Sequence, residues 1–377
     1  MNKHDQPNRR EFVRQAAVGG AVVVGGAAAT SELADDARAD SKKKPQSKVR
    51  IGVRFNEDWL NSQNDDDLRF FKQIGVDFVD IELKLVEGYE EHGVFTKAAL
   101  QQFIKRLDDV GLKIERANSL GPHYLNAHLN RPDGQKEIDK LKRVGEMVAD
   151  AEIPVFGIQA CQAALHVENS RGGWVYDRGR GGYRFLSFDI DRAESRAPQP
   201  KYKVAADQLW KGVINIYRQV MPTVEGSKTM IAMHGNDPPL YHYLGNPQIL
   251  CRFADFDRLF QEVPSKHNGI TFCVGTRYES GEDIFKGLQH FGTQGKLFHV
   301  HFRNVRGTLP SKRGYSEVMV DNGDIDMPQV AQTLKDVGYA GVIDYDHPMR
   351  IVGDKPLPKQ YVAFAVGYMR ALLQQSK

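Results

Sequence analysis

The sequence predicts a (β/α)₈ barrel, in which eight parallel strands alternate with eight helices around one core. Eight short runs rich in β-branched and aromatic residues alternate with longer segments whose apolar residues recur every three or four positions. The last four strand candidates are also evenly spaced, by about one strand, one helix and two loops. A doubly wound open sheet is the alternative, but no glycine-rich phosphate turn follows the expected first strand, RIGVRF.

The expected elements cover the chain from residue 50 to residue 373. The strand candidates are residues 50–55, 78–83, 113–118, 155–160, 231–237, 270–276, 298–304 and 342–347. The helix candidates are residues 65–74, 97–110, 136–151, 205–220, 253–263, 282–291, 327–337 and 358–373. These elements define one catalytic domain, residues 49–377.

The composition is that of a soluble globular protein, with 41% hydrophobic and 26% charged residues. The formal net charge is only +3, so electrostatic attraction to nucleic acid or to a membrane surface is weak. We therefore expect neither as a partner. Three scattered cysteines are too few for a disulfide framework. The sequence leaves the oligomeric state open, a homo-oligomer included.

Residues 1–39 read as a twin-arginine export signal, because Arg9-Arg10 precedes a weakly apolar run at residues 16–30. That run is shorter than the ~20 residues that span a bilayer, so we expect no stable membrane span. Cleavage after Ala29 or after Ala39 fits equally well. We therefore expect contact with the twin-arginine machinery, a disordered linker at 40–48, and a periplasmic or extracellular enzyme. A disordered basic N-terminus is the alternative interpretation.

One stretch, residues 161–201, interrupts the barrel rhythm between the fourth strand and its helix. It is long and rich in glycine, arginine and aromatic residues, as in RGGWVYDRGRGGYRF. Long loops at the catalytic end of a barrel are often lids or substrate walls, so we predict a lid-like insertion. RNA binding by an Arg-Gly segment is the weaker alternative, given the near-neutral chain.

Four residues that can bind metal fall at the ends of the last four strand candidates: His234, Cys273, His301 and Asp346, spaced by 39, 28 and 45 residues. The ends of parallel barrel strands meet at one rim, so these side chains can surround one divalent cation. Imidazole, thiolate and carboxylate together suit Mn²⁺, Fe²⁺, Co²⁺ or Zn²⁺. A catalytic role favours an ion with five or six ligands, hence Mn²⁺ or Fe²⁺. Taken singly, each residue is more often structural, and His299 competes with His301.

Several motifs around these residues resemble the mannonate dehydratase family of xylose-isomerase-like barrels. They are residues 233–239 (MHGNDPP), 268–276 (NGITFCVGT), 301–304 (HFRN), 322–327 (NGDIDM) and 346–347 (DH). The resemblance implies that His234, Cys273, His301 and Asp346 are the metal ligands. It makes His347 and Tyr361 the proton-transfer pair and Arg303 the residue that holds the substrate carboxylate. Asn236 and Asp237, next to the first ligand, are further candidates for binding substrate.

The chain departs from the family pattern at several places, and the Arg-Trp-Tyr-Gly opening of the family's first strand is absent. Gly235-Asn236 replaces the usual Pro-Asp after the first ligand, Asp344-Tyr345 replaces Arg-Pro before the last, and Ser316 stands where a histidine is common. These differences bear on substrate identity more than on the metal site.

The function that the resemblance implies is dehydration of a sugar acid, as D-mannonate to 2-keto-3-deoxygluconate plus water. The proton next to a carboxylate is weakly acidic, so its removal needs a cation beside the developing charge and separate acid and base groups. Which of His347 and Tyr361 is the base stays open. A metal-dependent sugar or keto-acid isomerase or epimerase is the first alternative, and a non-catalytic exported sugar-acid binding protein is the second.

Overall fold

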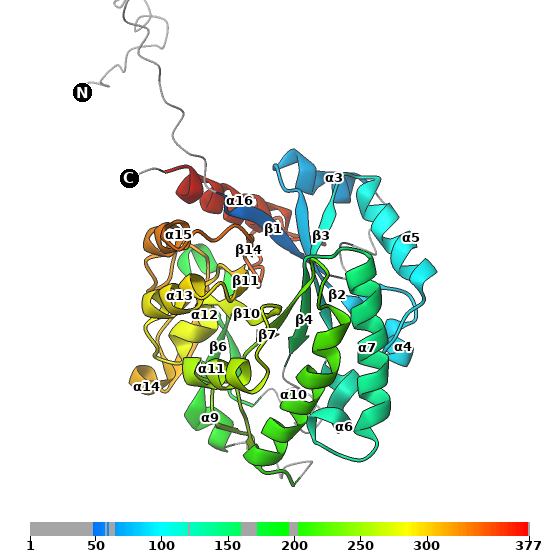
Figure 1. The fold of residues 1–377 in the computed structure, drawn as a ribbon. Helices are drawn as coiled ribbons and strands as arrows, with labels where there is room; N and C mark the ends of the chain where they lie inside the picture. The colour runs from blue at the N-terminus through cyan, green and yellow to red at the C-terminus, as the bar shows by residue number, and fades with distance from the viewer. Residues whose placement is uncertain are drawn as a thin grey trace, which may run out of the picture. The chain divides into compact units, whose positions relative to one another are not determined.

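The computed structural model of the chain describes residues 48–56, 59, 65–119, 121–159, 172–195 and 203–375. Within them, eight parallel strands close into a barrel in the order β1-β14-β11-β10-β7-β4-β3-β2, as Figure 1 shows. This confirms the predicted fold class. The export-signal prediction for residues 1–39, and nearly all of the expected linker, lie outside the described residues.

All eight barrel strands coincide with strand candidates from the sequence. They are β1 Arg50–Phe55, β2 Phe78–Glu82, β3 Lys113–Ser119, β4 Val155–Gln159, β7 Met230–His234, β10 Asn268–Cys273, β11 Leu297–His301 and β14 Val342–Asp344. The last four are shorter than expected, because the chain leaves the barrel at or just before each candidate ligand.

Eight principal helices surround these strands. They are α3 Asp65–Gln73, α5 Lys97–Asp108, α7 Gly134–Asp150, α10 Ala206–Val220, α11 Phe253–Glu262, α13 Ile284–Thr293, α15 Met327–Asp336 and α16 Lys359–Gln374. Their ends lie within two residues of the expected ones. The start of α13 moves to Ile284 because the Asp283 carboxylate accepts a hydrogen bond from the Lys286 amide at 3.1 Å and caps the helix.

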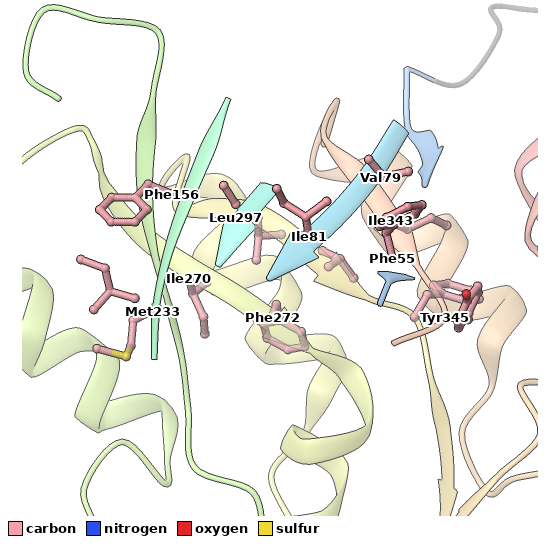
Figure 2. Close-up of a cluster of buried hydrophobic side chains, with 14 of the residues drawn as sticks. Phe55, Val79, Ile81, Phe156, Met233, Ile270, Phe272, Leu297, Ile343 and Tyr345 are labelled. Atoms are coloured by element: carbon pink, nitrogen blue, oxygen red, sulfur yellow. The ribbon is translucent and has the colours of Figure 1, made fainter. Parts of the chain in front are cut away.

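Side chains alternate along the barrel strands between an apolar outer face and a polar inner face. The outer face packs against the helices and forms the main core, part of which Figure 2 shows with Phe55, Ile81, Phe156 and Phe272. Each such side chain, once fully buried, contributes about 1.5–3 kcal/mol of transfer free energy. The apolar core therefore lies between the strands and the helices.

The inner face carries charged residues that pair across the barrel. Asp80 on β2 accepts a hydrogen bond from Arg116 on β3 at 2.7 Å and one from Arg54 on β1 at 3.2 Å. Arg116 also donates to the Asn118 amide oxygen at 3.0 Å. Buried charges persist only when they are paired in this way. The barrel therefore has a polar interior that leads up to the rim with the candidate ligands.

A separate four-stranded antiparallel sheet, here called the cap sheet, has the order β12-β13-β6-β5. Its strands are β5 Trp174–Arg178, β6 Arg184–Asp189, β12 Asn304–Arg306 and β13 Gly314–Val318. The first two come from the predicted insertion at 161–201, of which residues 172–195 are described. The other two come from the segment after β11, where no separate strands were predicted. Phe188 on β6 and Tyr315 on β13 stack with ring centroids 5.5 Å apart and help hold the cap sheet together.

Short elements complete the described chain. They are α4 Tyr89–His92, α6 Leu125–His128, α9 Ile190–Ser195, α12 Val274–Glu279, α14 Leu309–Lys312, β8 His242–Tyr243 and β9 Asn246–Pro247. Among the described residues, none of the helices has the length and apolar character that crossing a bilayer requires.

Candidate metal centre and active-site cavity

The four predicted ligands converge at one rim of the barrel. His234, Cys273 and His301 are the last residues of β7, β10 and β11, and they offer ligand atoms that all lie within 4.8 Å of one another. Asp346 follows β14 by two residues. Its Oδ2 lies 3.3 Å from His301 Nδ1 and 3.9 Å from Cys273 Sγ. The structure thus brings together the four side chains that the strand spacing singled out.

Cys273 lies in an environment that favours its thiolate. Its Sγ accepts hydrogen bonds from Arg303 Nε at 3.2 Å and from the Thr276 hydroxyl at 3.1 Å. Burial alone would raise the pKa of this thiol. Arg303, His234 and His301 outweigh burial and hold the pKa well below its usual value. The thiolate is the form of cysteine that binds metals.

The other three candidate ligands carry charges that suit a cation between them. Burial lowers the pKa of His234 and so favours the neutral imidazole, the form that binds metal. Burial opposes protonation of His301 as well, but Asp346 next to it raises the pKa well above the usual value. Burial would raise the pKa of Asp346, but His301 and His347 hold it well below the usual range. The centre therefore favours a positive charge beside His301, carried by a proton or by a metal ion.

The ring nitrogens of His301 support the same interpretation. Both are buried and, among the described residues, make no hydrogen bond, although Asp346 Oδ2 lies 3.3 Å from Nδ1 and Asp80 Oδ2 lies 3.8 Å from Nε2. Such groups are rare in folded proteins and call for a ligand, an ion or a water molecule. Together with the adjacent thiolate and carboxylate, they fit a divalent metal.

A second group of buried ligand-type residues lies deeper in the barrel: Asp80, His299, His301 and Asp344. His299 Nε2 lies 2.9 Å from Asp344 Oδ2, and Asp80 is already paired with Arg54 and Arg116. These contacts separate the two histidines of β11. His299 belongs to the ion-paired interior, whereas His301 reaches the rim.

A cavity of about 420 Å³ opens at the candidate metal centre, a size that suits a small-molecule substrate. Its walls come from barrel strands, from the loops that follow them and from the cap sheet. The lining residues are Arg54, Gln159, Trp174, Leu186, His234, Gly235, Asp237, His301, Glu317, Asp346 and His347.

His347 is held beside the centre by an acid from the cap sheet. Its Nδ1 lies 2.9 Å from Glu317 Oε2, and its Nε2 lies 3.6 Å from Asp346 Oδ2. Burial would lower the pKa of His347, but Asp346 and Glu317 raise it to about 9. Glu317 thus holds Nδ1, and His347 lines the cavity, where a side chain must lie to transfer a proton to a bound molecule.

Arg303 is buried and is not among the described residues that line the cavity. It is 4% exposed, and its guanidinium donates to Asp237 at 2.5 Å and to Glu279 at 2.7 Å, besides Cys273. Gly275 makes this position accessible, because a Cβ there would lie 2.8 Å from Arg303 Cζ. These bonds hold Arg303 beside the candidate ligand Cys273, and its binding of a substrate carboxylate stays a prediction.

The remaining predicted residues divide between the cavity and the core. Asp237 lines the cavity and accepts a hydrogen bond from the Tyr315 hydroxyl at 2.6 Å. Asn236 is buried and donates its side-chain amide to the Ile249 carbonyl. Tyr361 on α16 is buried against Tyr345, with ring centroids 5.9 Å apart, and is not among the described residues that line the cavity. Its role in proton transfer stays a prediction.

Comparison with known proteins identifies the family. Residues 189–374, which include every candidate ligand, match the family model D-mannonate dehydratase (UxuA). A mannonate dehydratase of Thermotoga petrophila is 30% identical over 282 residues, covering 67% of this chain and 77% of that protein. This chain belongs to the mannonate dehydratase family. Mannonate dehydratase 2 of Halalkalibacterium halodurans is 23% identical and covers 81% of this chain and 93% of its own length.

The fold agrees with this membership. The crystal structure of mannonate dehydratase from Streptococcus suis serotype 2 superimposes with a TM-score of 0.74 at 22% identity, covering 87% of this chain and 93% of that one. Dehydratases of this family are hydro-lyases, so the chain is a carbon–oxygen lyase.

Sequence reasoning missed several residues of the cavity wall. Arg54, Gln159, Trp174, Leu186 and Glu317 line the cavity, and none of them was singled out. Arg54 and Gln159 lie near the ends of β1 and β4, so the rule that located the four ligands could have found them. Trp174 and Leu186 lie in the insertion at 161–201 that was predicted as a lid or substrate wall, although neither was named. Glu317 carried no signal, because its strand was not recognised.

Proposed function

We propose that this protein dehydrates D-mannonate to 2-keto-3-deoxygluconate with a divalent metal held by His234, Cys273, His301 and Asp346. The observation that carries the proposal is that these four side chains converge at one rim of the barrel. Three of them, His234, His301 and Asp346, line a cavity that His347 also lines. Membership in the mannonate dehydratase family supports the choice of reaction and substrate.

The donor set supports Mn²⁺ or Fe²⁺. Two imidazoles, a thiolate and a carboxylate suit a borderline divalent ion, and an ion that accepts five or six ligands keeps positions open for substrate oxygens. When bound, the metal supplies the Lewis acidity that stabilises negative charge developing beside the substrate carboxylate.

The protein side chains transfer the proton and limit the access of bulk water. His347 lies at the cavity with Nδ1 anchored on Glu317, so its other nitrogen can exchange a proton with the substrate. Glu317 fixes the orientation of the ring. Trp174 and Leu186 of the cap sheet give the cavity an apolar wall that limits access of bulk water.

The decisive experiment combines metal analysis with product analysis. The purified protein is loaded with Mn²⁺ or Fe²⁺ and incubated with D-mannonate. Formation of a 2-keto-3-deoxy acid, its loss with chelator and its recovery on adding metal back support the proposal. A product of unchanged mass would instead identify an isomerase or epimerase. Tight binding of the sugar acid without any product would identify a binding protein.

We propose further that the enzyme is exported through the twin-arginine route. The support is Arg9-Arg10 followed by the apolar run at residues 16–30. This route carries folded proteins, so a metal bound before export would travel with the enzyme. Cell fractionation tests the proposal: the wild type should appear outside the cytoplasm, and a variant with both arginines changed to lysine should remain inside. Equal distribution of the two would refute it.

A further inference from the structure

Two arginines come close to the candidate metal centre, and the structure gives them different surroundings. Arg303 is enclosed, and its guanidinium is bound by Asp237, Glu279, Thr276 and Cys273. Since an arginine has five N–H donors, this set leaves Arg303 little capacity for a further ligand. It also does not line the cavity.

Arg54, near the end of β1, has the opposite surroundings. Its side chain is 18% exposed and lines the cavity, where it is the single arginine or lysine among the described lining residues. NH1 donates to Asp80 at 3.2 Å and NH2 donates to Glu82 at 3.0 Å. Within the described part of the chain these bonds occupy two of its five donors, which leaves N–H groups for a ligand.

The position of Arg54 relative to the centre also suits a carboxylate. Its NH1 lies 3.5 Å from Asp346 Oδ1, so the guanidinium borders the candidate ligand directly. A small acid bound at the centre would therefore have this cation within reach. The two acids behind Arg54 hold the planar guanidinium in one orientation, which lowers the entropy lost on binding.

We propose that Arg54, and not Arg303, binds the carboxylate of the sugar acid at this site. The proposal rests on the proposed function for the choice of ligand and adds the residue that selects acids over neutral sugars. Arg303 is then a positioning residue that keeps Cys273 and Asp237 in place. A planar fork can meet both carboxylate oxygens, which a lysine ammonium cannot do.

The test compares an acid with its neutral counterpart. Binding of D-mannonate and of D-mannitol, which lacks the carboxylate, is measured by calorimetry on metal-loaded protein. All proteins carry His347→Asn, so that substrate is not consumed. Arg54→Gln should weaken mannonate binding by roughly tenfold to a hundredfold, the range expected for a lost charge-assisted hydrogen-bond pair. Mannitol binding and bound metal should change by less than about threefold.

Two further variants keep the test informative. Arg54→Lys retains the positive charge beside Asp80 and Glu82, so it should fold and should weaken mannonate binding by about tenfold. Arg50→Lys is the matched control, since Arg50 lies on the same strand but pairs with Glu115 at the far end. It should leave both affinities unchanged.

Three results would overturn the proposal. They are equal weakening of mannonate and mannitol in the Arg54 variants, no weakening of either, and absence of mannonate binding in the protein with native Arg54. The proposed function fails separately. If the wild type binds mannonate through Arg54 but yields no keto-deoxy acid, the reaction is wrong and the carboxylate site stands.

Discussion

The rim at the ends of β7, β10, β11 and β14 and the cap sheet both shape the cavity, but the chain builds them in different ways. Each rim residue is placed by its own strand, and the barrel closes the four strands into one site. The cap sheet joins β6 to β13, so that Ser187 lies opposite Ser316 and their hydroxyls are 2.8 Å apart. The rim carries the candidate metal ligands, and the cap sheet contributes Trp174, Leu186 and Glu317 to the cavity wall. Variants in each region should therefore separate metal binding from substrate binding.

The largest effect should follow a change at the rim itself. Cys273→Ser removes the thiolate, so bound metal should fall and turnover should drop by about a thousandfold or more. Metal content by mass spectrometry and initial rates check both. Cys251→Ser is the control, because Cys251 is also buried but its thiol donates to the Leu240 carbonyl, away from the cavity. Full metal occupancy in Cys273→Ser would contradict the ligand assignment.

The next prediction tests whether catalytic turnover can be lost while the metal stays bound. His347→Asn should lower turnover by about a hundredfold to ten-thousandfold while metal content stays unchanged, since the residue moves a proton and is not a ligand. Glu317→Gln, which keeps a group of the same size next to His347, should give a smaller loss. Wild-type rates in His347→Asn would remove this residue from the mechanism.

A smaller effect should come from the cap sheet. Trp174 lines the cavity and packs against Phe188, with ring centroids 5.2 Å apart. Trp174→Ala should raise KM about tenfold through lost apolar contact, with metal content unchanged and kcat within about threefold. Tyr176→Ala, at an exposed aromatic residue of the same strand, should leave both constants alone. Metal loss in Trp174→Ala would mean that the two regions are not separable.

The last prediction concerns the stability of the scaffold that carries both regions, where no effect on catalysis is expected. Burial lowers the pKa of His128 on α6 to about 4, against about 6.5 in the unfolded chain. The unfolded state therefore gains a proton first as the pH falls. The contribution of His128 to the free energy of unfolding should be fully present above pH 6.5. It should decrease by up to about 3 kcal/mol as the pH falls toward 4.

The His128→Phe variant tests this contribution. It should lose less stability than the wild type over the same pH range, as measured by urea unfolding. His92→Phe is the matched control, because His92 lies on the protein surface. Parallel pH curves for wild type and His128→Phe would contradict the expectation. Metal binding at neutral pH should not change in either variant.

The fold could be predicted because each barrel strand and helix is encoded locally. Alternating β-branched residues mark the strands and three- to four-residue spacing marks the helices, so all eight units were located. The strand positions also located the four candidate ligands, because a residue at the end of a barrel strand lies on the rim. These residues are His234, Cys273, His301 and Asp346.

The cap sheet could not be predicted, because its pairing is between segments far apart in sequence. Strand β13 pairs with β6 of the insertion, and neither strand repeats the pattern of the barrel. Glu317 was missed for this reason. The family resemblance predicts that Arg303 binds the substrate carboxylate. The structure adds what the sequence could not show, namely that Arg303 donates hydrogen bonds to Cys273, Glu279 and Asp237. Pairing partners of a charged residue are not visible in a sequence.

The backbone at Asp346 is left-handed, with φ of 58°. In a regular strand, consecutive side chains point to opposite faces, so a metal ligand and its neighbour could not share one cavity. The left-handed residue breaks this alternation, and Asp346 and His347 both line the cavity. A single peptide unit thus joins the candidate metal ligand Asp346 to the candidate proton-transfer residue His347, so a change in the backbone at one of them moves the other. Asparagine and aspartate tolerate this conformation better than most other residues. Most substitutions at position 346 should therefore strain the backbone and shift His347 as well.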